Sequence, residues 1–254
     1  MTLPAVHIVV PCYNEATRLD TEQMLALADA RPDLGLVFVD DGSTDDTAAR
    51  LRALAAARPD RLTVLTLGKN SGKAEAVRQG LLAALARPGE LVGYLDADLS
   101  TPIEEMLRLV RVAESRGAAV VLGARVALLG TKIERKPARH YLGRVFASAA
   151  SLLLNLPVYD TQCGAKVLRR SPSLAAALSE PFVSRWAFDV ELIGRLLVGA
   201  AGVPPTPPEA FLEVPLASWR EVSGSKLRPS AMVGTLRDLA LIGGDLARRR
   251  RKMR

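Results

Sequence analysis

Two acids separated by one small residue follow a short apolar run in the segment "GYLDADLS", residues 93–100. They are Asp96 and Asp98, with Ala97 between them. Side chains two positions apart at the end of a strand can face the same side, so these carboxylates would repel each other unless a cation lay beside them. Mg²⁺ takes one or two protein carboxylates and completes its shell with phosphate oxygens and water. The pair therefore predicts a divalent metal that holds a diphosphate.

A second interpretation is that this segment only begins the next helix. Ser100 or Thr101 would be the N-cap, Pro102 would lie in the first turn, and Glu104 would complete a capping box. This accounts for residues 100–104 but not for the two acids before them. We therefore expect metal-binding acids followed by a capped helix.

Two further polar segments follow apolar runs. Asp40 ends the run at 34–39, where a carboxylate can accept a hydrogen bond from a nucleobase or a ribose, and Ser43 or Thr44 can cap the helix after it. The segment "GKNSGK", residues 68–73, is not a P-loop, because Leu67 stands where the Walker A motif requires glycine. Its Lys73 lies beside a predicted helix start and can still face a phosphate.

The elements that must position these residues alternate along the first 125 residues. The expected strands are 5–11, 34–43, 61–68, 91–98 and 118–125, and the expected helices are 21–30, 45–57, 74–86 and 103–115. This alternation predicts an α/β fold with a Rossmann-like, mostly parallel sheet covered by helices on both faces. Ligands bind at the carboxyl ends of such strands, and the polar segments follow those ends. We therefore expect a binding cleft at that edge.

The alternation stops near residue 126. A basic stretch at 131–144 is followed by an apolar run at 145–159 and by the segments "DTQCG", "WAFDVEL" and "VSGSK". We interpret residues 1–125 as a ligand-binding half and residues 126–226 as a lid-and-acceptor half of one domain, 1–226. Residues 227–254 are expected to form an amphipathic helix with a basic tail.

The formal net charge is +7, and six of the positive side chains lie within residues 248–254. The tail can bind an anionic membrane surface through residues 232–254, bind nucleic acid, or be solvated. We expect no nucleic-acid partner. The run at 145–159 is too short to span a bilayer and contains Pro157, and the N-terminus lacks the build of a signal peptide. The prediction is a cytoplasmic protein, peripheral on the cytoplasmic membrane face.

The motifs resemble a known family. "VVPCYNE", "VDDGSTDDT", "NSGKAEAVRQG" and "DADLS" resemble the nucleotide-sugar motifs of family 2 glycosyltransferases, which have the GT-A fold. "DTQCGAKVLRR", "WAFDVEL" and "EVPLASWREVSGSK" are similar to the dolichyl- or polyprenyl-phosphate β-glucosyltransferases, neighbours of the dolichyl-phosphate mannose synthases. The resemblance implies an inverting, metal-dependent transfer of a hexose, glucose from UDP-glucose, to a lipid phosphate, with Mg²⁺ or Mn²⁺ as cofactor.

The resemblance also implies roles for individual residues. Asp96 and Asp98 would hold the metal, Asp98 and Asp189 would be catalytic, and Cys163 would lie near the transferred sugar. The expected nucleotide-sugar-binding residues are Pro11, Tyr13, Asn14, Glu15, Asp40, Lys73, Asp96, Ala97 and Gln162.

The acceptor remains open between two classes. A lipid phosphate is already largely ionised at neutral pH and needs cations rather than a base. The candidates for binding it are Arg135, Arg139, Arg144 and Lys226, with Pro137 expected to interrupt the helical spacing of the arginines. A soluble hydroxyl acceptor would instead need Asp189 as general base. A third reading, a non-catalytic binding protein that uses the basic tail, leaves the acids unexplained.

Overall fold

The computed structural model describes residues 5–134, 137–222 and 231–253, with residues 137–142, 231–233, 235 and 236 described by their backbone alone. The first half contains β1 (Val6–Cys12), α1 (Thr21–Asp29), β2 (Leu34–Asp40), α2 (Thr47–Ala57), β3 (Leu62–Thr66), α3 (Lys73–Leu85), β4 (Leu91–Leu95), α4 (Ile103–Arg116) and β5 (Val120–Ala124). The second half contains β6 (Lys132–Glu134), α5 (Pro137–Leu154), β7 (Ala165–Arg169), α6 (Pro172–Leu178), α7 (Phe188–Val198), the 3₁₀ turn η1 (Pro208–Ala210), β8 (Phe211–Pro215), β9 (Ser218–Arg220) and α8 (Ala231–Lys252).

Seven strands form one sheet in the order β3-β2-β1-β4-β7-β5-β8. All run parallel except β7, which lies antiparallel between β4 and β5. The expected strands of the first half are found within a few residues of their predicted bounds, and β7 and β8 extend the same sheet with residues from the second half. The predicted α/β class with a mostly parallel sheet is confirmed. A separate two-stranded sheet pairs β6 with β9.

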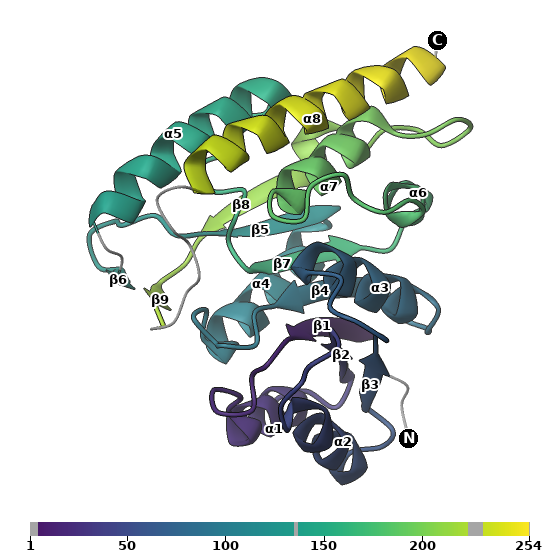
Figure 1. The fold of residues 1–254 in the computed structure, drawn as a ribbon, viewed down its shortest axis with the longest axis vertical. Helices are drawn as coiled ribbons and strands as arrows, with labels where there is room; N and C mark the ends of the chain where they lie inside the picture. Colours follow the sequence, from purple (N-terminus) through teal and green to yellow (C-terminus); the bar gives the residue numbers. More distant parts are fainter. Residues whose placement is uncertain (1–4, 135–136, 223–230, 254) are drawn as a thin grey trace.

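The sheet is buried on both faces, because two apolar clusters lie on opposite sides of it. One cluster contains side chains of α1, α2 and α4, and the other contains side chains of α3, α5, α6, α7 and α8. Successive residues of β1 alternate between them: Ile8 and Val10 belong to the first cluster, and Val9 to the second. Figure 1 shows the helices as layers around the strands, with α5 and α8 side by side along one side.

Helix α3 approaches the sheet closely at Gly80. A Cβ at this position would lie 2.3 Å from a methyl group of Val9 and 2.8 Å from one of Val39. Glycine costs helix stability, but here only its missing side chain lets the backbone approach the strands. This contact places the N-terminus of α3, and with it Lys73, beside the ends of β1 and β2.

The interruption expected at Pro137 falls at the start of helix α5, between Arg135, which lies outside the described residues, and the two arginines 139 and 144. Helix α5 begins at this residue, where a proline ring suits the fixed φ and the missing N–H would have had no helical partner. Arg139 and Arg144 therefore share one helix. Among the described residues, no helix is long and apolar enough to cross a bilayer.

Candidate active site

The carboxyl ends of β1, β2 and β4 meet at one edge of the sheet. The register pairs Cys12 with Asp40, and β4 lies on the other side of β1. The polar segments at 11–15, 40–43 and 96–98 are therefore neighbours in space, as the alternation of elements predicts. We call this group the acid edge, defined by Asp40, Asp96 and Asp98.

Asn14 connects the loops that follow β1 and β2. Its backbone N–H donates to Ser43 Oγ at 3.0 Å, and its side-chain oxygen accepts from the Thr44 N–H at 2.8 Å. The residue has a positive φ of 52°, a conformation that asparagine tolerates better than most residues. Its amide oxygen is thus already used within the protein. Pro11 and Tyr13 are partly buried beside it.

Glu15 also holds this loop in place. Its backbone N–H donates to Thr47 Oγ1 at 2.8 Å, and its carboxylate contacts the Arg18 guanidinium at 2.5 Å. Capping of α2 by Ser43 or Thr44 is wrong: the helix begins at Thr47, whose N–H and hydroxyl both donate to Asp45. The Asp45 carboxylate, which is nearer to the helix start, accepts the hydrogen bond from the Thr47 N–H that a side-chain cap would have accepted.

Asp40 and Asp41 are both buried, with different partners. Asp40 Oδ1 accepts a local bond, from the Ser43 N–H at 3.0 Å. Asp41 accepts from the Ser71 and Gly72 N–H groups at 2.7 and 2.8 Å, one on each carboxylate oxygen. Asp41 therefore holds the loop that precedes α3. Sequence reasoning missed this role, although a second acid beside Asp40 was a visible signal.

Asp96 pairs with Lys73. The ammonium lies 2.5 Å from Asp96 Oδ1, with both side chains partly exposed. Although desolvation opposes the change, the carboxylates of Asp96, Asp189 and Asp98 raise the pKa of Lys73. Lys73 therefore stays protonated beside the acids, at the N-terminus of α3, where a phosphate group would meet both a cation and the positive end of the helix dipole.

Asp98 and the turn after it differ from the predicted capping box. Asp98 Oδ1 accepts from the Ser100 N–H at 3.0 Å. The N-cap of α4 is Pro102, which has no side-chain cap bond, because the helix begins one residue later than a cap at Thr101 requires. Leu99 has a φ of 50°, which is strained for a residue with a branched side chain. This turn keeps both acids at the end of β4, with buried Ala97 between them.

The acids suit a divalent cation only as part of a larger shell. Within the described residues, no three His, Cys, Asp or Glu side chains are grouped as a metal site. Two carboxylates are nonetheless the protein share that Mg²⁺ usually takes when a diphosphate supplies further oxygens. Asp96 and Asp98 fit such a cation.

Asp189 lies in the first turn of α7 and is almost fully buried. Its Oδ1 accepts from the Tyr94 hydroxyl and from the Lys166 ammonium, the latter at 2.6 Å. Burial first, and then the charge of Asp189, raise the pKa of Tyr94 well above its usual value. Sequence reasoning singled out Asp189 but missed both donors; the available signal was a lysine inside the otherwise apolar "AKVL" run.

Gln162 lies two residues after Asp160, which forms a buried ion pair with Arg125. Arg125 donates from Nε and Nη2 to Asp160 at 2.7 and 2.8 Å, and Asp160 Oδ1 accepts from the Gln162 N–H at 3.1 Å. Although burial opposes it, Arg125 holds the pKa of Asp160 well below its usual range. The Gln162 Nε2 atom is buried and has no hydrogen-bond partner among the described residues. Either a ligand or an ordered water can complete the bonding of such an amide.

The proposed acceptor cations are only partly described. The Arg144 guanidinium lies 3.6 Å from the centre of the Tyr159 ring and donates to the Tyr159 carbonyl at 3.3 Å. Arg135 and Lys226 lie outside the described residues, as does the side chain of Arg139. The structure therefore places one of the four.

Comparison with known proteins agrees with this geometry. Residues 7–174 match the family described as "Glycosyl transferase family 2". A dolichyl-phosphate beta-glucosyltransferase of Trichomonas vaginalis is 32% identical over 92% of this chain and 69% of its own length. A polyprenol monophosphomannose synthase of Mycolicibacterium smegmatis is 28% identical over 88% of this chain and 81% of its own length.

A solved structure shares the fold. Glucosyl-3-phosphoglycerate synthase from Mycobacterium tuberculosis, crystallised with Mn²⁺, UDP and glucosyl-3-phosphoglycerate, aligns with a TM-score of 0.65 at 20% identity, over 95% of this chain and 80% of that one. The matching architecture is that of GT-A enzymes. From its sequence motifs, its sheet and these relatives, the chain belongs to glycosyl transferase family 2 and is a glycosyltransferase with the GT-A fold.

Proposed function

We propose that the chain transfers glucose from UDP-glucose to a polyprenyl or dolichyl phosphate, with inversion at the anomeric carbon. The observation that carries this proposal is the acid edge, where Asp40, Asp96 and Asp98 lie at the carboxyl ends of neighbouring parallel strands and Lys73 pairs with Asp96. The similarity to dolichyl-phosphate beta-glucosyltransferases supports glucose as the sugar, and these relatives together with the polyprenol monophosphomannose synthase support a lipid-phosphate acceptor. The resemblance to family 2 glycosyltransferases supports inversion at the anomeric carbon and the use of a divalent metal.

The chain's own side chains would divide the work at the donor. Asp40 would accept from the nucleobase or ribose, and Lys73 would turn from Asp96 toward the diphosphate. Asp96 and Asp98 would hold Mg²⁺ or Mn²⁺, which neutralises charge that develops on the departing diphosphate. The unpaired Gln162 amide is available to a sugar hydroxyl.

A phosphate acceptor suits the state of Asp189 better than a hydroxyl acceptor does. A hydroxyl must lose its proton to a base, and Asp189 has only Oδ2 left for this, because Oδ1 accepts from an ammonium and a hydroxyl. A phosphate monoester is largely ionised at neutral pH, so it can attack without such a base. Arg144 is the described cation that would receive it.

The lipid acceptor also calls for a membrane surface, and α5 and α8 offer one. Val145 and Leu152 of α5 and Leu241 of α8 are exposed apolar side chains on the two adjacent helices. Residues 248–252 of α8 are all basic. We infer that this combination docks on anionic lipid, because apolar insertion and charge attraction act together at a bilayer interface.

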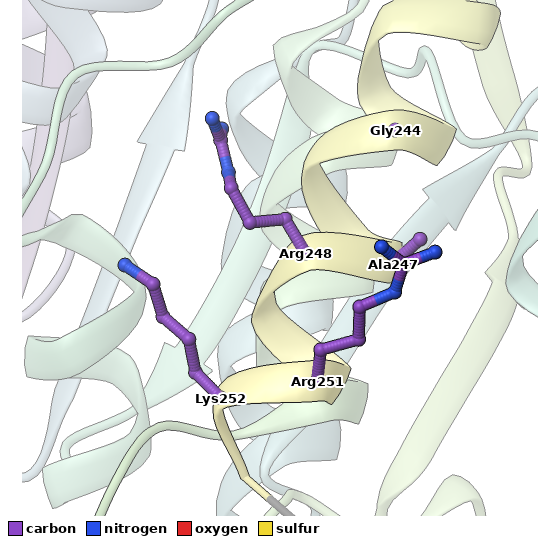
Figure 2. Close-up of a pocket in the computed structure, with 5 residues that line it drawn as sticks. All are labelled: Gly244, Ala247, Arg248, Arg251 and Lys252. Carbon is purple, nitrogen blue, oxygen red and sulfur yellow. The ribbon is translucent and has the colours of Figure 1, made fainter.

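The end of α8 carries an open hollow lined by exposed residues of this one helix, three of them basic. It has a volume of about 490 Å³ and is lined by Gly244, Ala247, Arg248, Arg251 and Lys252. Figure 2 shows Arg248 and Lys252 extending from one side of the helix and Arg251 from the other. The pocket contains no residue of the acid edge, so it fits a surface contact rather than the donor.

A transfer assay tests the proposal. The purified chain is given labelled UDP-glucose, Mn²⁺ or Mg²⁺ and a short polyprenyl phosphate, with GDP-mannose in parallel and Asp98→Ala as the inactive control. A lipid-linked glucose that is absent in the control is the expected product. Metal-dependent UDP release with only a hydroxyl acceptor would move the function to a soluble substrate, and a mannosyl product would change the donor.

A further inference from the structure

Lys166 carries a charge in the middle of the sheet. Its side chain is 1% exposed, on strand β7 between β4 and β5. A lysine is almost never buried in this way unless it is paired. Its ammonium donates to Asp189 Oδ1 and to the Cys163 carbonyl, each at 2.6 Å. The charge is therefore directed at one acid of the candidate site.

Tyr94 holds the same acid from the neighbouring strand. It lies directly opposite Lys166 in the β4–β7 register, and the Lys166 ammonium is 5.2 Å from the centre of its ring. Its hydroxyl donates to the same oxygen, Asp189 Oδ1. Two donors on two strands thus restrict rotation of the carboxylate, and Oδ2 takes part in neither bond.

This arrangement continues into the acid edge. Tyr94 is two residues before Asp96, so both face the same side of β4. Lys73, which pairs with Asp96, also interacts electrostatically with Asp189. The charges therefore alternate from Lys166 through Asp189 and Lys73 to Asp96.

We propose that Lys166 and Tyr94 are positioning residues that hold Asp189 as a fixed anion, with Oδ2 presented to the transferred sugar. The inference rests on the proposed function and assigns Asp189 an electrostatic role beside the sugar rather than that of a proton acceptor. A merely structural ion pair would act on folding alone, since a buried pair is often replaceable by apolar groups. The two roles predict different couplings with Asp189.

A double-mutant cycle measures that coupling. Tyr94→Phe removes one hydroxyl and keeps the ring, and Asp189→Asn keeps the shape of the side chain. If Tyr94 acts through Asp189, Tyr94→Phe lowers kcat/KM for the donor by about tenfold, and the double variant has a kcat/KM no lower than that of Asp189→Asn alone. Effects that multiply in the double variant would overturn the proposal.

Lys166→Met extends the cycle to the second donor. It should behave like Tyr94→Phe, with no further loss of kcat/KM in the Asp189→Asn background. Arg195→Met is the matched control, because Arg195 forms an equally buried pair with Glu191 on the same helix as Asp189. It should lower the unfolding temperature, and its effect on kcat/KM should multiply with that of Asp189→Asn. If Lys166→Met does not fold, the cycle with Tyr94→Phe still tests the proposed positioning of Asp189.

A binding experiment tests the positioning role without knowledge of the acceptor. The same variants are titrated with a nucleotide sugar and with its nucleotide, the sugar being chosen from a panel of UDP and GDP sugars by thermal stabilisation of the wild type. The wild type should bind the nucleotide sugar more tightly than the nucleotide alone. Each single variant should lose the same share of this difference in affinity, and the double variant should lose no more than a single variant does. A wild type that binds its donor but transfers nothing to polyprenyl phosphate refutes the proposed function alone. A wild type with no preference for any sugar form refutes the positioning role.

Discussion

Gly164 is the position at which a single methyl group should disable the acid edge. A Cβ on this residue would lie 2.1 Å from Asp96 Oδ2 and 2.2 Å from its Cγ, far inside van der Waals contact. The backbones cannot easily separate, because the Asp96 N–H donates to the Gly164 carbonyl at 3.0 Å, next to the β4–β7 pairing. In Gly164→Ala the Asp96 carboxylate must therefore rotate away.

The magnitude follows from what Asp96 loses. Crowding of this kind lowers the free energy of unfolding by about 1–3 kcal/mol. The loss should be near the low end of this range here, because the Asp96 side chain can rotate away from the new methyl group. For a chain of this size that lowers the unfolding temperature by about 2–4 °C. A charge-assisted contact is worth about 1.5–3 kcal/mol, so loss of one metal ligand should weaken Mn²⁺-dependent UDP binding by about 10- to 150-fold.

Calorimetric titration of UDP with and without Mn²⁺, together with a thermal melt, measures both effects. Gly68→Ala is the matched control, because its Cβ would meet no atom within 4 Å. It should bind UDP and Mn²⁺ like the wild type. Unchanged Mn²⁺-dependent binding in Gly164→Ala would mean that Asp96 does not hold the cation, and the assignment of the metal to this edge would be refuted.

Three further outcomes are expected. Asp41→Asn should lower the unfolding temperature and raise the KM for the donor severalfold, because each oxygen of Asp41 accepts from one backbone N–H of the loop before α3; an unchanged KM would remove this loop from the donor site. Asp160 has a lowered pKa in the folded chain, so its contribution to stability is present above the ordinary aspartate pKa of about 4 and is lost as pH falls below it. Denaturant titrations from pH 5 to 2 should therefore show a flatter pH profile for Asp160→Asn than for the wild type, and parallel profiles would contradict the pairing. Replacing the basic residues at 248, 250, 251 and 252 by glutamine should reduce sedimentation with phosphatidylglycerol vesicles but not kcat on a short, water-soluble acceptor; full sedimentation of that variant would exclude the tail as the lipid contact.

Much of the fold was predictable because it follows from the pattern of apolar and polar residues along short segments of the sequence. Apolar runs that end in acids, alternating with helical periodicity, predicted a mostly parallel sheet with Asp40, Asp96 and Asp98 at one edge, and that sheet is found. The prediction succeeds because the carboxyl ends of parallel strands share an edge whatever the details of packing. The helix starts were less predictable: nearby carboxylates and prolines, rather than Ser or Thr, occupy those positions at α2 and α4.

The family, the fold class and the acids that could hold a metal were predictable from the amino-acid sequence, because they depend on residue types and on spacing along the chain. The side chains that surround these acids depend instead on how distant segments pack. Lys166 and Tyr94 meet Asp189 because β7 inserts antiparallel beside β4, a pairing of segments 72 residues apart by the register Tyr94↔Lys166 that no local pattern encodes. Buried charges take their partners from the neighbours that strand order provides, and strand order is a property of the whole chain.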